Sequence, residues 1–245
     1  SPVPVFMEKS VETLKLFFGA VYAGCFYVLI NPEFPAPRVQ AILETLNARK
    51  IVTSHAFSEK LSAMDGLDVL FLEDLLQTPE DAAALDKVRE NALDTDPLYA
   101  NFTSGSTGVP KGVVVCHRSV IDFIEHFTSL FSITQEDVIG NQAPFDFDVS
   151  VKDIYSAMKT GARLEIIPKP LFSQPAKLLD HLCDRNITTM IWAVSALCLV
   201  TTFHGLDYRV PETVNKVLFS GEAMPMKHLK QWMSHLPEAR FINLY

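Results

Sequence analysis

Residues 99–116 concentrate residue types that bind anions. They read Tyr-Ala-Asn-Phe-Thr-Ser-Gly-Ser-Thr-Gly-Val-Pro-Lys-Gly-Val-Val-Val-Cys. The glycines let backbone N–H groups approach an anion closely, the hydroxyls donate further hydrogen bonds, and a lysine neutralises charge. The pattern predicts a loop that holds a polyphosphate, although a flexible hairpin tip would have a similar composition. The candidate phosphate-binding residues are Thr103, Ser104, Gly105, Ser106, Thr107, Gly108 and Lys111.

This loop differs from a Walker loop. A Walker loop places Gly-Lys-Ser/Thr at the start of a helix. Here Pro110 precedes Lys111, and a Val-Val-Val run typical of a strand follows. We therefore expect the loop to join one strand to another and to make no use of a helix dipole.

The composition is that of a folded protein with a sizeable core. Of the 245 residues, 48% are hydrophobic and 20% are charged. This excludes a disordered or fibrous chain. The formal net charge of −8 lacks the electrostatic footprint of a nucleic-acid binder, so we expect no nucleic-acid partner.

Cysteine usage and hydropathy predict a cytoplasmic protein with no membrane segment. The cysteines form no C-x-x-C pair, which argues against a zinc site, and we expect buried, reduced thiols at Cys25, Cys116, Cys183 and Cys198. The uncharged run from Leu16 to Ile30 is shorter than the roughly 20 apolar residues of a membrane span. Residues 1–9 lack the order of charged and apolar regions that marks a signal peptide.

Strand-like and helix-like segments alternate along the chain. Strands are expected at 3–7, 26–30, 49–53, 69–72, 99–102, 112–116, 138–141, 163–167, 188–192, 216–219 and 240–244. The principal helices are expected at 10–22, 35–47, 118–131, 151–158, 174–185, from 195 onward, and at 226–235. This alternation predicts an α/β fold with mostly parallel sheets flanked by helices.

We expect two similar layered α/β/α halves that meet near the polar segment 132–137. Residues 1–134 form the first half, with the phosphate loop, and residues 135–245 form the second. Ligands of open parallel sheets bind beyond the carboxyl ends of the strands, so the candidate sites should lie there.

The ordered loop sequence Thr-Ser-Gly-Ser-Thr-Gly-Val-Pro-Lys-Gly, with His117-Arg118 after it, resembles the core signature of the adenylate-forming superfamily. That superfamily includes acyl-CoA synthetases, luciferases and the adenylation domains of nonribosomal peptide synthetases. Four further segments are similar to motifs of the amino-acid-activating members: Ala23-Gly24…Tyr27-Val28…Asn31-Pro32, Phe147-Asp-Val-Ser150, Phe219-Ser-Gly-Glu-Ala223 and Asn243-Leu-Tyr245. The first departs from its motif at Leu29 and Asn31, where proline and aspartate are usual.

The resemblance favours the N-terminal core of an amino-acid adenylation domain, close to the D-alanine–carrier-protein ligases. It implies that a carboxylate and ATP give an acyl-adenylate and pyrophosphate, and that the acyl group is then loaded onto the phosphopantetheine thiol of a peptidyl or acyl carrier protein. The phosphate loop would hold the β- and γ-phosphates. The residues implied in adenine binding are Gly221, Glu222, Ala223, Asn243 and Tyr245.

The resemblance also implies an amino-acid pocket. Asp148 would pair with the substrate ammonium group. A carboxylate at the start of a helix is also favoured by the helix dipole, and Asp146 or Asp153 could fill that role equally. The side-chain pocket would comprise Val149, Lys152, Ile191, Leu218, Ser220 and Leu244. Lys152 suggests an acidic or polar substrate side chain, unless the lysine turns towards solvent.

Some parts of the reaction fall outside this chain. The implied cofactors are ATP and Mg²⁺, and the magnesium ligand is expected just beyond Tyr245. No residue of the chain is assigned a catalytic or metal-binding role, and we interpret His117 as structural. The remainder of the adenylation domain is an expected partner, without which we expect weak ATP affinity and no turnover. The alternatives are an acyl-CoA synthetase-like enzyme for another carboxylic acid, and a non-catalytic nucleotide-binding module.

Overall fold

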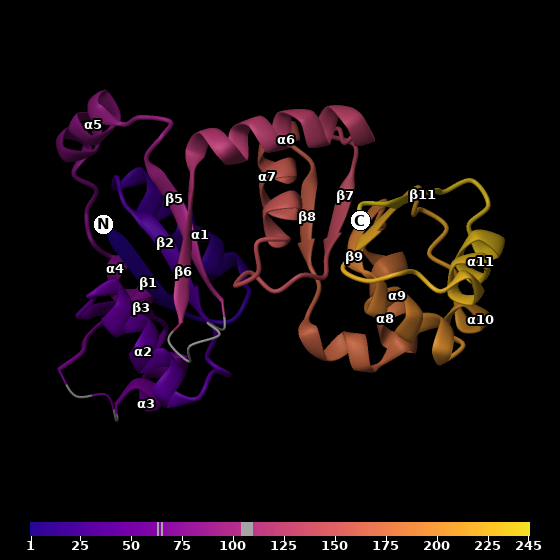
Figure 1. Cartoon of the computed structure of the whole chain (residues 1–245), viewed down its shortest axis with the longest axis horizontal. Coiled ribbons are helices and arrows are strands. Elements are labelled where there is room, and N and C mark those ends of the chain that lie inside the picture. Colours follow the sequence, from indigo (N-terminus) through magenta and orange to yellow (C-terminus); the bar gives the residue numbers. More distant parts are fainter. Residues whose placement is uncertain (63, 65, 104–109) are drawn as a thin grey trace. The chain divides into compact units, whose positions relative to one another are not determined.

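The computed structural model describes residues 1–62, 64, 66–103 and 110–245. Its contacts divide the chain into two compact units. The first unit comprises residues 1–122 and 145–148, and the second comprises residues 123–144 and 149–245. Figure 1 shows the elements of each unit in sequence colours.

The first unit is built on a six-stranded sheet with the order β4-β3-β1-β2-β5-β6. Its strands are β1 (Pro2–Phe6), β2 (Phe26–Ile30), β3 (Lys50–Thr53), β4 (Asp68–Phe71), β5 (Pro97–Thr103) and β6 (Lys111–Cys116). Strands β1 to β5 pair in parallel, and β6 pairs antiparallel with β5. The helices that precede β6 are α1 (Val11–Tyr22), α2 (Ala36–Leu46), α3 (Ser58–Leu61), α4 (Leu72–Leu75) and α5 (Ala82–Asn91), with a 3₁₀ turn η1 (His55–Phe57).

Side chains that alternate along β2 explain why helices cover both faces of this sheet. Tyr27 stacks on Phe17 of α1, with ring centroids 3.9 Å apart. Ile30 points to the opposite face, where it packs in a cluster with Ile42 of α2. Helix α1 starts where it does because the Ser10 hydroxyl accepts a hydrogen bond from a backbone N–H of its first turn. Each face of the sheet thus buries apolar residues against a helix.

The second unit contains a parallel five-stranded sheet with the order β11-β10-β9-β7-β8. Its strands are β7 (Val138–Asn141), β8 (Arg163–Ile166), β9 (Thr189–Ala193), β10 (Lys216–Ser220) and β11 (Arg240–Asn243). The long helix α6 (His117–Phe131) begins in the first unit and ends in the second. The other helices are α7 (Ser150–Thr160), α8 (Pro175–Asp184), α9 (Val194–Thr202), α10 (Gly205–Tyr208) and α11 (Met226–His235), with a 3₁₀ segment η2 (Lys169–Ser173).

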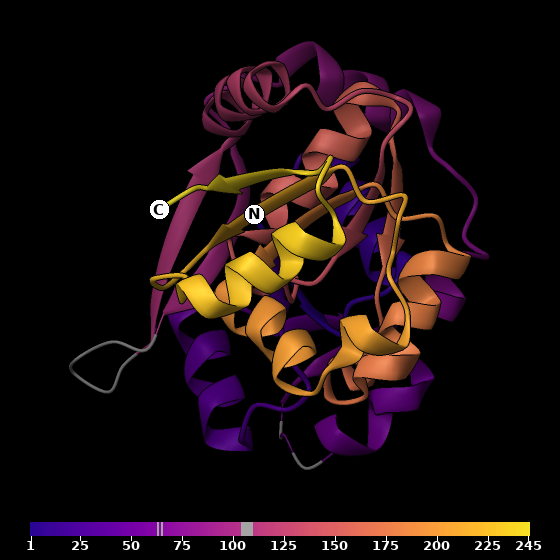
Figure 2. The same ribbon diagram turned by 90° about the vertical axis from the view of Figure 1, so that its right-hand side faces the viewer.

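Two apolar clusters cover the two faces of this second sheet. Trp192 of β9 packs in one cluster with Trp232 of α11, and Figure 2 shows α11 in front of the strands. Leu218 of β10 packs in the other cluster with Phe127 of α6 and with Ala157 of α7. The α/β fold with mostly parallel sheets flanked by helices is therefore confirmed.

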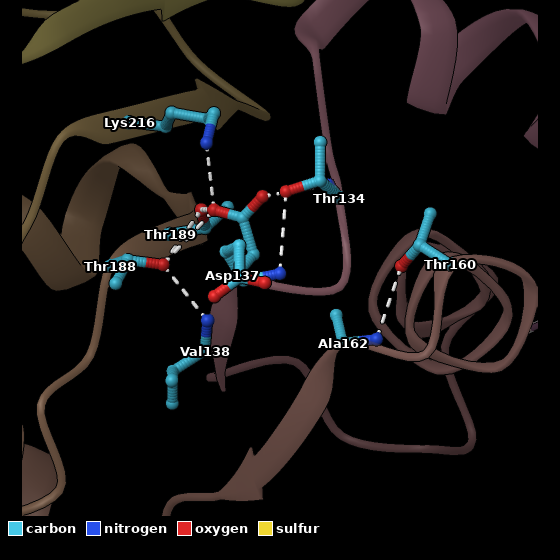
Figure 3. Close-up of polar contacts among 9 residues, drawn as sticks. Thr134, Asp137, Val138, Thr160, Ala162, Thr188, Thr189 and Lys216 are labelled. Atoms are coloured by element: carbon cyan, nitrogen blue, oxygen red, sulfur yellow. Dashed lines mark hydrogen bonds and ion pairs between the residues drawn. The ribbon is translucent and has the colours of Figure 1, made fainter.

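A buried ion pair joins the amino ends of three strands of the second sheet (Figure 3). Asp137 accepts hydrogen bonds through Oδ1 from Lys216 Nζ at 2.7 Å, Thr189 Oγ1 at 2.6 Å and Thr188 Oγ1 at 3.0 Å. Its Oδ2 accepts from the backbone N–H of Thr134 at 2.8 Å. Burial alone would raise the pKa of Asp137, but the hydrogen bonds from Lys216 and Thr189 outweigh it and lower that pKa.

Residues 1–134 and 135–245 remain the proposed halves. The two compact units divide within α6, after residue 122, and Phe127 and Ile133 pack in the core of the second unit. One other sequence-based expectation differs from what the structure shows. The expectation of buried cysteines is wrong: all four thiols are free but only partly buried. Within the described residues, no helix combines the length and apolar character needed to cross a membrane.

Candidate functional site

The predicted phosphate loop joins two antiparallel strands, as its sequence indicated. Thr103 at the end of β5 pairs with Lys111 at the start of β6, and both side chains are exposed. The other candidates, Ser104 to Gly108, lie outside the described residues. Gly112 has a packing role, since a Cβ there would lie 3.1 Å from the ring of Phe102. The two described candidates therefore form the last pair of the β5–β6 hairpin before the loop.

Asp148 belongs to the first unit, as the hairpin does. Its side chain is exposed, whereas Asp146 is half-buried. Asp153 is fully buried and accepts a hydrogen bond from Asn141 Nδ2 at 2.6 Å. Of these three aspartates, the exposed Asp148 carboxylate is the one most open to a ligand.

The candidate adenine-binding residues follow the carboxyl ends of two adjacent strands. Phe219 of β10 pairs with Asn243 of β11, and the Phe219 carbonyl accepts the Leu244 N–H at 2.9 Å. Gly221 directly follows β10 with a φ of 103°, and a Cβ at this position would meet no atom within 4 Å. The backbone beside this glycine is therefore open at the position of a side chain, and glycine is the residue that adopts such a φ readily.

Tyr245 is 89% exposed and follows β11. Its backbone N–H donates to Asn243 Oδ1 at 3.0 Å, which fixes the orientation of the Asn243 amide. Glu222 and Ala223 are exposed in the turn after β10. This structure brings all five candidate adenine-binding residues to the ends of two hydrogen-bonded strands.

The six candidate pocket residues all lie in the second unit. Ile191 and Leu218 are paired on β9 and β10 and belong to the buried cluster that contains Phe127, and Leu244 packs against that cluster. Ser220 ends β10 on the same face by alternation. The remaining two, Val149 and Lys152, are half-buried, Val149 at the N-cap of α7 and Lys152 in its first turn. The buried residues thus have a core role whether or not they contact a substrate.

His117 lies at the first position of α6, where its backbone N–H donates to the Asp96 carbonyl at 3.1 Å. This contact accords with a structural role. Within residues 1–62, 64, 66–103 and 110–245, no cluster of His, Cys, Asp and Glu side chains could hold a metal ion.

Sequence reasoning missed a column of four buried aromatic rings in the first unit. Tyr27 of β2 lies between Phe17 of α1 and Tyr99 of β5, with centroid separations of 3.9 and 5.7 Å. Phe145 contacts Phe17 with centroids 6.2 Å apart. The sequence carries a partial signal, because Tyr27 and Tyr99 both fall in predicted strands, but nothing in it pairs Phe145 with α1.

The fold and these sites define an α/β protein whose candidate ligand-binding residues cluster at a glycine-containing hairpin and at parallel strand ends. Residues 1–245 match the family model described as "AMP-binding enzyme". The chain belongs to the AMP-binding enzyme family.

Curated relatives agree with this assignment. The chain is 29% identical over 244 residues to the D-alanine–D-alanyl carrier protein ligase of Staphylococcus aureus (strain bovine RF122 / ET3-1), covering 100% of this chain and 49% of the relative. It is 29% identical over 249 residues to the enzyme of the same name from Bacillus cytotoxicus, covering 100% of this chain and 48% of that relative. The chain thus spans about half the length of the curated relatives that it matches.

Solved structures share the fold. The AMPPNP-bound form of the nonribosomal peptide synthetase FmoA3 matches with a TM-score of 0.84 at 25% identity, covering 99% of this chain and 25% of FmoA3. VinN in complex with L-aspartate matches with a TM-score of 0.83 at 19% identity, covering 98% of this chain and 61% of VinN.

Proposed function

We propose that this chain is the part of an adenylate-forming ligase that activates an amino acid with ATP, before the aminoacyl group is loaded onto a carrier-protein thiol. Family membership and the names of the curated relatives support the reaction class. The observation that carries the amino-acid assignment is Asp148, an exposed carboxylate in the same compact unit as the β5–β6 hairpin.

The chemistry needs charge neutralisation and positioning more than covalent participation of the protein. A carboxylate oxygen of the amino acid attacks the α-phosphorus of ATP. The bond from that phosphorus to the bridging oxygen of pyrophosphate breaks, and pyrophosphate leaves with the bonding electrons. Lys111 and the loop residues would hold the β- and γ-phosphates, so that the lysine charge opposes the charge that grows on the leaving group.

The other candidate groups orient the two substrates. Asp148 would pair with the α-ammonium group. Gly221 and the residues after it would lie against one face of adenine, and Tyr245 would stack on the other. Mg²⁺, when bound, supplies further neutralisation of phosphate charge. Because no cluster among the described residues fits a metal ion, we assign the ion no step.

The names of the relatives support the carrier-protein step. The S. aureus and B. cytotoxicus proteins are D-alanine–D-alanyl carrier protein ligases, and FmoA3 is a nonribosomal peptide synthetase. In this chain the acceptor would be a carrier protein whose thiol attacks the acyl carbon and releases AMP. The half-buried Lys152 leads us to propose an acidic or polar substrate side chain.

ATP–pyrophosphate exchange tests the proposal, with the complete natural polypeptide that contains this sequence. We expect exchange that depends on one amino acid with an acidic or polar side chain. Replacing a charged partner of a substrate ion costs about 1.5–3 kcal/mol, so Asp148→Asn should raise the KM for the amino acid roughly 10- to 150-fold. Asp146→Asn, two residues away, is the matched control and should leave that KM within about twofold.

Three results would count against the proposal. A preference for a bulky aliphatic amino acid would refute the role given to Lys152. Equal exchange with a carboxylic acid that lacks the amine would favour the acyl-CoA synthetase-like alternative. Nucleotide binding without exchange for any carboxylic acid would favour a non-catalytic module.

A further inference from the structure

The segment 145–148 is attached to the first unit, although the residues on both sides of it belong to the second. Phe145 is 3% exposed and contacts Phe17 of α1 with ring centroids 6.2 Å apart. Phe17 in turn stacks on Tyr27 with an interplanar angle of 8°. This segment ends at Asp148, and Val149, the N-cap of α7, is the first residue to return to the second unit.

The same aromatic column reaches the strand that leads into the phosphate hairpin. Tyr27 stacks on Tyr99 of β5 with centroids 5.7 Å apart and an interplanar angle of 21°. The rings of Phe17, Tyr27, Tyr99 and Phe145 are 1%, 4%, 6% and 3% exposed. Buried rings in stacked or tilted contact pack closely and have few alternative arrangements. The column therefore connects the segment before Asp148 to β5 through α1 and β2.

The charge of Asp148 also acts on a residue of β5. Burial first, and the negative charge of Asp148 second, raise the pKa of Tyr99 to about 12. The carboxylate of Asp148 therefore lies near enough for its charge to act on the Tyr99 side chain. Asp148 nevertheless keeps its exposed side chain.

We propose that Phe145 and the stacked rings of Phe17, Tyr27 and Tyr99 position Asp148, and so hold the amine-recognising carboxylate on the same rigid frame as the phosphate hairpin. These four are positioning residues, because none of them need touch a substrate. The inference rests on the proposed function for the role of Asp148, but the attachment of the segment can be measured independently of activity.

The test compares two substitutions of the same kind in the first unit. Phe145→Leu removes the ring contact with Phe17 and keeps an apolar side chain. Phe57→Leu is the control, because the Phe57 ring contacts Phe6 at the same centroid separation of 6.2 Å but lies in the cluster with α2. Both variants are made in the complete natural polypeptide.

The first measurement is native-state proteolysis by chymotrypsin, with cleavage after the exposed Phe147 identified by mass. Cleavage under native conditions follows the population of the locally opened segment. We expect about tenfold faster cleavage at this bond in Phe145→Leu and in Tyr99→Leu. Tyr99→Phe, which keeps the ring, and Phe57→Leu should both cleave at the wild-type rate.

The second measurement is the ratio of kcat/KM for the amino acid to kcat/KM for the same acid without its amine, in the exchange assay. In Phe145→Leu we expect this ratio to fall about tenfold because the KM for the amino acid rises. The KM for ATP should stay within about twofold of its wild-type value. Phe57→Leu should leave the ratio unchanged even if it lowers stability equally.

The outcomes separate the two ideas. Equal cleavage after Phe147 in Phe145→Leu and Phe57→Leu would overturn the positioning role, whatever the activity. Faster cleavage in Phe145→Leu with an unchanged amine ratio would support the attachment but overturn its role in positioning Asp148 for the amine. Asp148→Asn in the same assay tests the amine-binding role itself. Faster cleavage together with a lower ratio would support both.

Discussion

The ion pair between Asp137 and Lys216 offers the sharpest test of the energetics of this fold. The two side chains are 3% and 13% exposed, and Nζ lies 2.7 Å from Oδ1. Removing one partner of a buried pair leaves an uncompensated charge and costs about 3–5 kcal/mol. In Lys216→Met, Asp137 would keep hydrogen bonds from two threonine hydroxyls and one backbone N–H. We therefore expect Lys216→Met to lower the free energy of unfolding by about 3 kcal/mol, the lower limit of that range.

The matched control is Lys159→Met. Lys159 Nζ lies 2.6 Å from Glu125 Oε2, so the pair is equally short, but its side chains are 31% and 60% exposed. Exposed pairs contribute about 0–1 kcal/mol. Both lysines lie in the second unit, so the two variants differ mainly in the burial of the charges.

Tryptophan fluorescence during urea unfolding is the appropriate assay. Both tryptophans, Trp192 and Trp232, lie in one buried cluster of the second unit, at 1% and 0% exposure. Their emission therefore reports the unfolding of the unit that holds the ion pair. Lys216→Met should lower the free energy of unfolding at pH 7 by more than Lys159→Met does. An equal or smaller loss would mean that Asp137 is effectively solvated, and it would refute the assignment of a buried ion pair.

The stability that Asp137 contributes falls as the pH becomes acidic. The pKa of Asp137 is lowered in the folded state, so its contribution to stability is fully present above the ordinary aspartate pKa of about 3.9. That contribution is lost as the pH falls through the lowered folded-state pKa. In Lys216→Met the carboxyl group is easier to protonate. The stability difference between wild type and variant should thus persist from about pH 7 to pH 5 and shrink below about pH 4.

Two further predictions concern a thiol and a glycine. The Ser119 hydroxyl, 3.3 Å from the Cys116 thiol, lowers the pKa of Cys116, whereas burial raises the pKa of Cys183. Iodoacetamide at about pH 7.5 should therefore alkylate Cys116 faster than Cys183, and Ser119→Ala should slow the alkylation of Cys116. Mass spectrometry of the labelled peptides measures both rates. Equal rates at the two cysteines would contradict this. A Cβ on Gly140 would lie 3.0 Å from Ile187, so Gly140→Ala should lower the free energy of unfolding by about 1–3 kcal/mol. The same fluorescence assay measures this change. An unchanged urea midpoint would contradict the prediction and show that β7 can shift to make room.

Local pattern determined most of the secondary structure of this protein. Strand β2 at Phe26–Ile30 and helix α11 at Met226–His235 were predicted with the bounds that the structure shows, because β-branched and aromatic runs, helical periodicity and flanking Asn-Pro or Pro residues act within a few positions. The single-turn helices α3, α4 and α10 were not predicted, since four residues are too few to show a period.

The candidate ligand residues were likewise chosen by local order within motifs. That order indicated a strand-to-strand loop ending at Lys111, and the pairing of Thr103 with Lys111 confirms the hairpin. The roles of Asp148, Gly221 and the pocket residues remain proposals, because a motif gives residue types and spacing but no measurement of binding.

Only the tertiary structure decided which distant residues meet. Asp137 and Lys216 are 79 positions apart and were not linked by any sequence signal. Phe145 was expected in the second half, yet it packs on Phe17 of α1. The physical reason is that the hydrophobic effect is non-directional, so an apolar ring gains a similar free energy from burial against many different well-packed partners. The hydrophobicity of the ring therefore predicts that it is buried, and the path of the chain determines which residues it packs against.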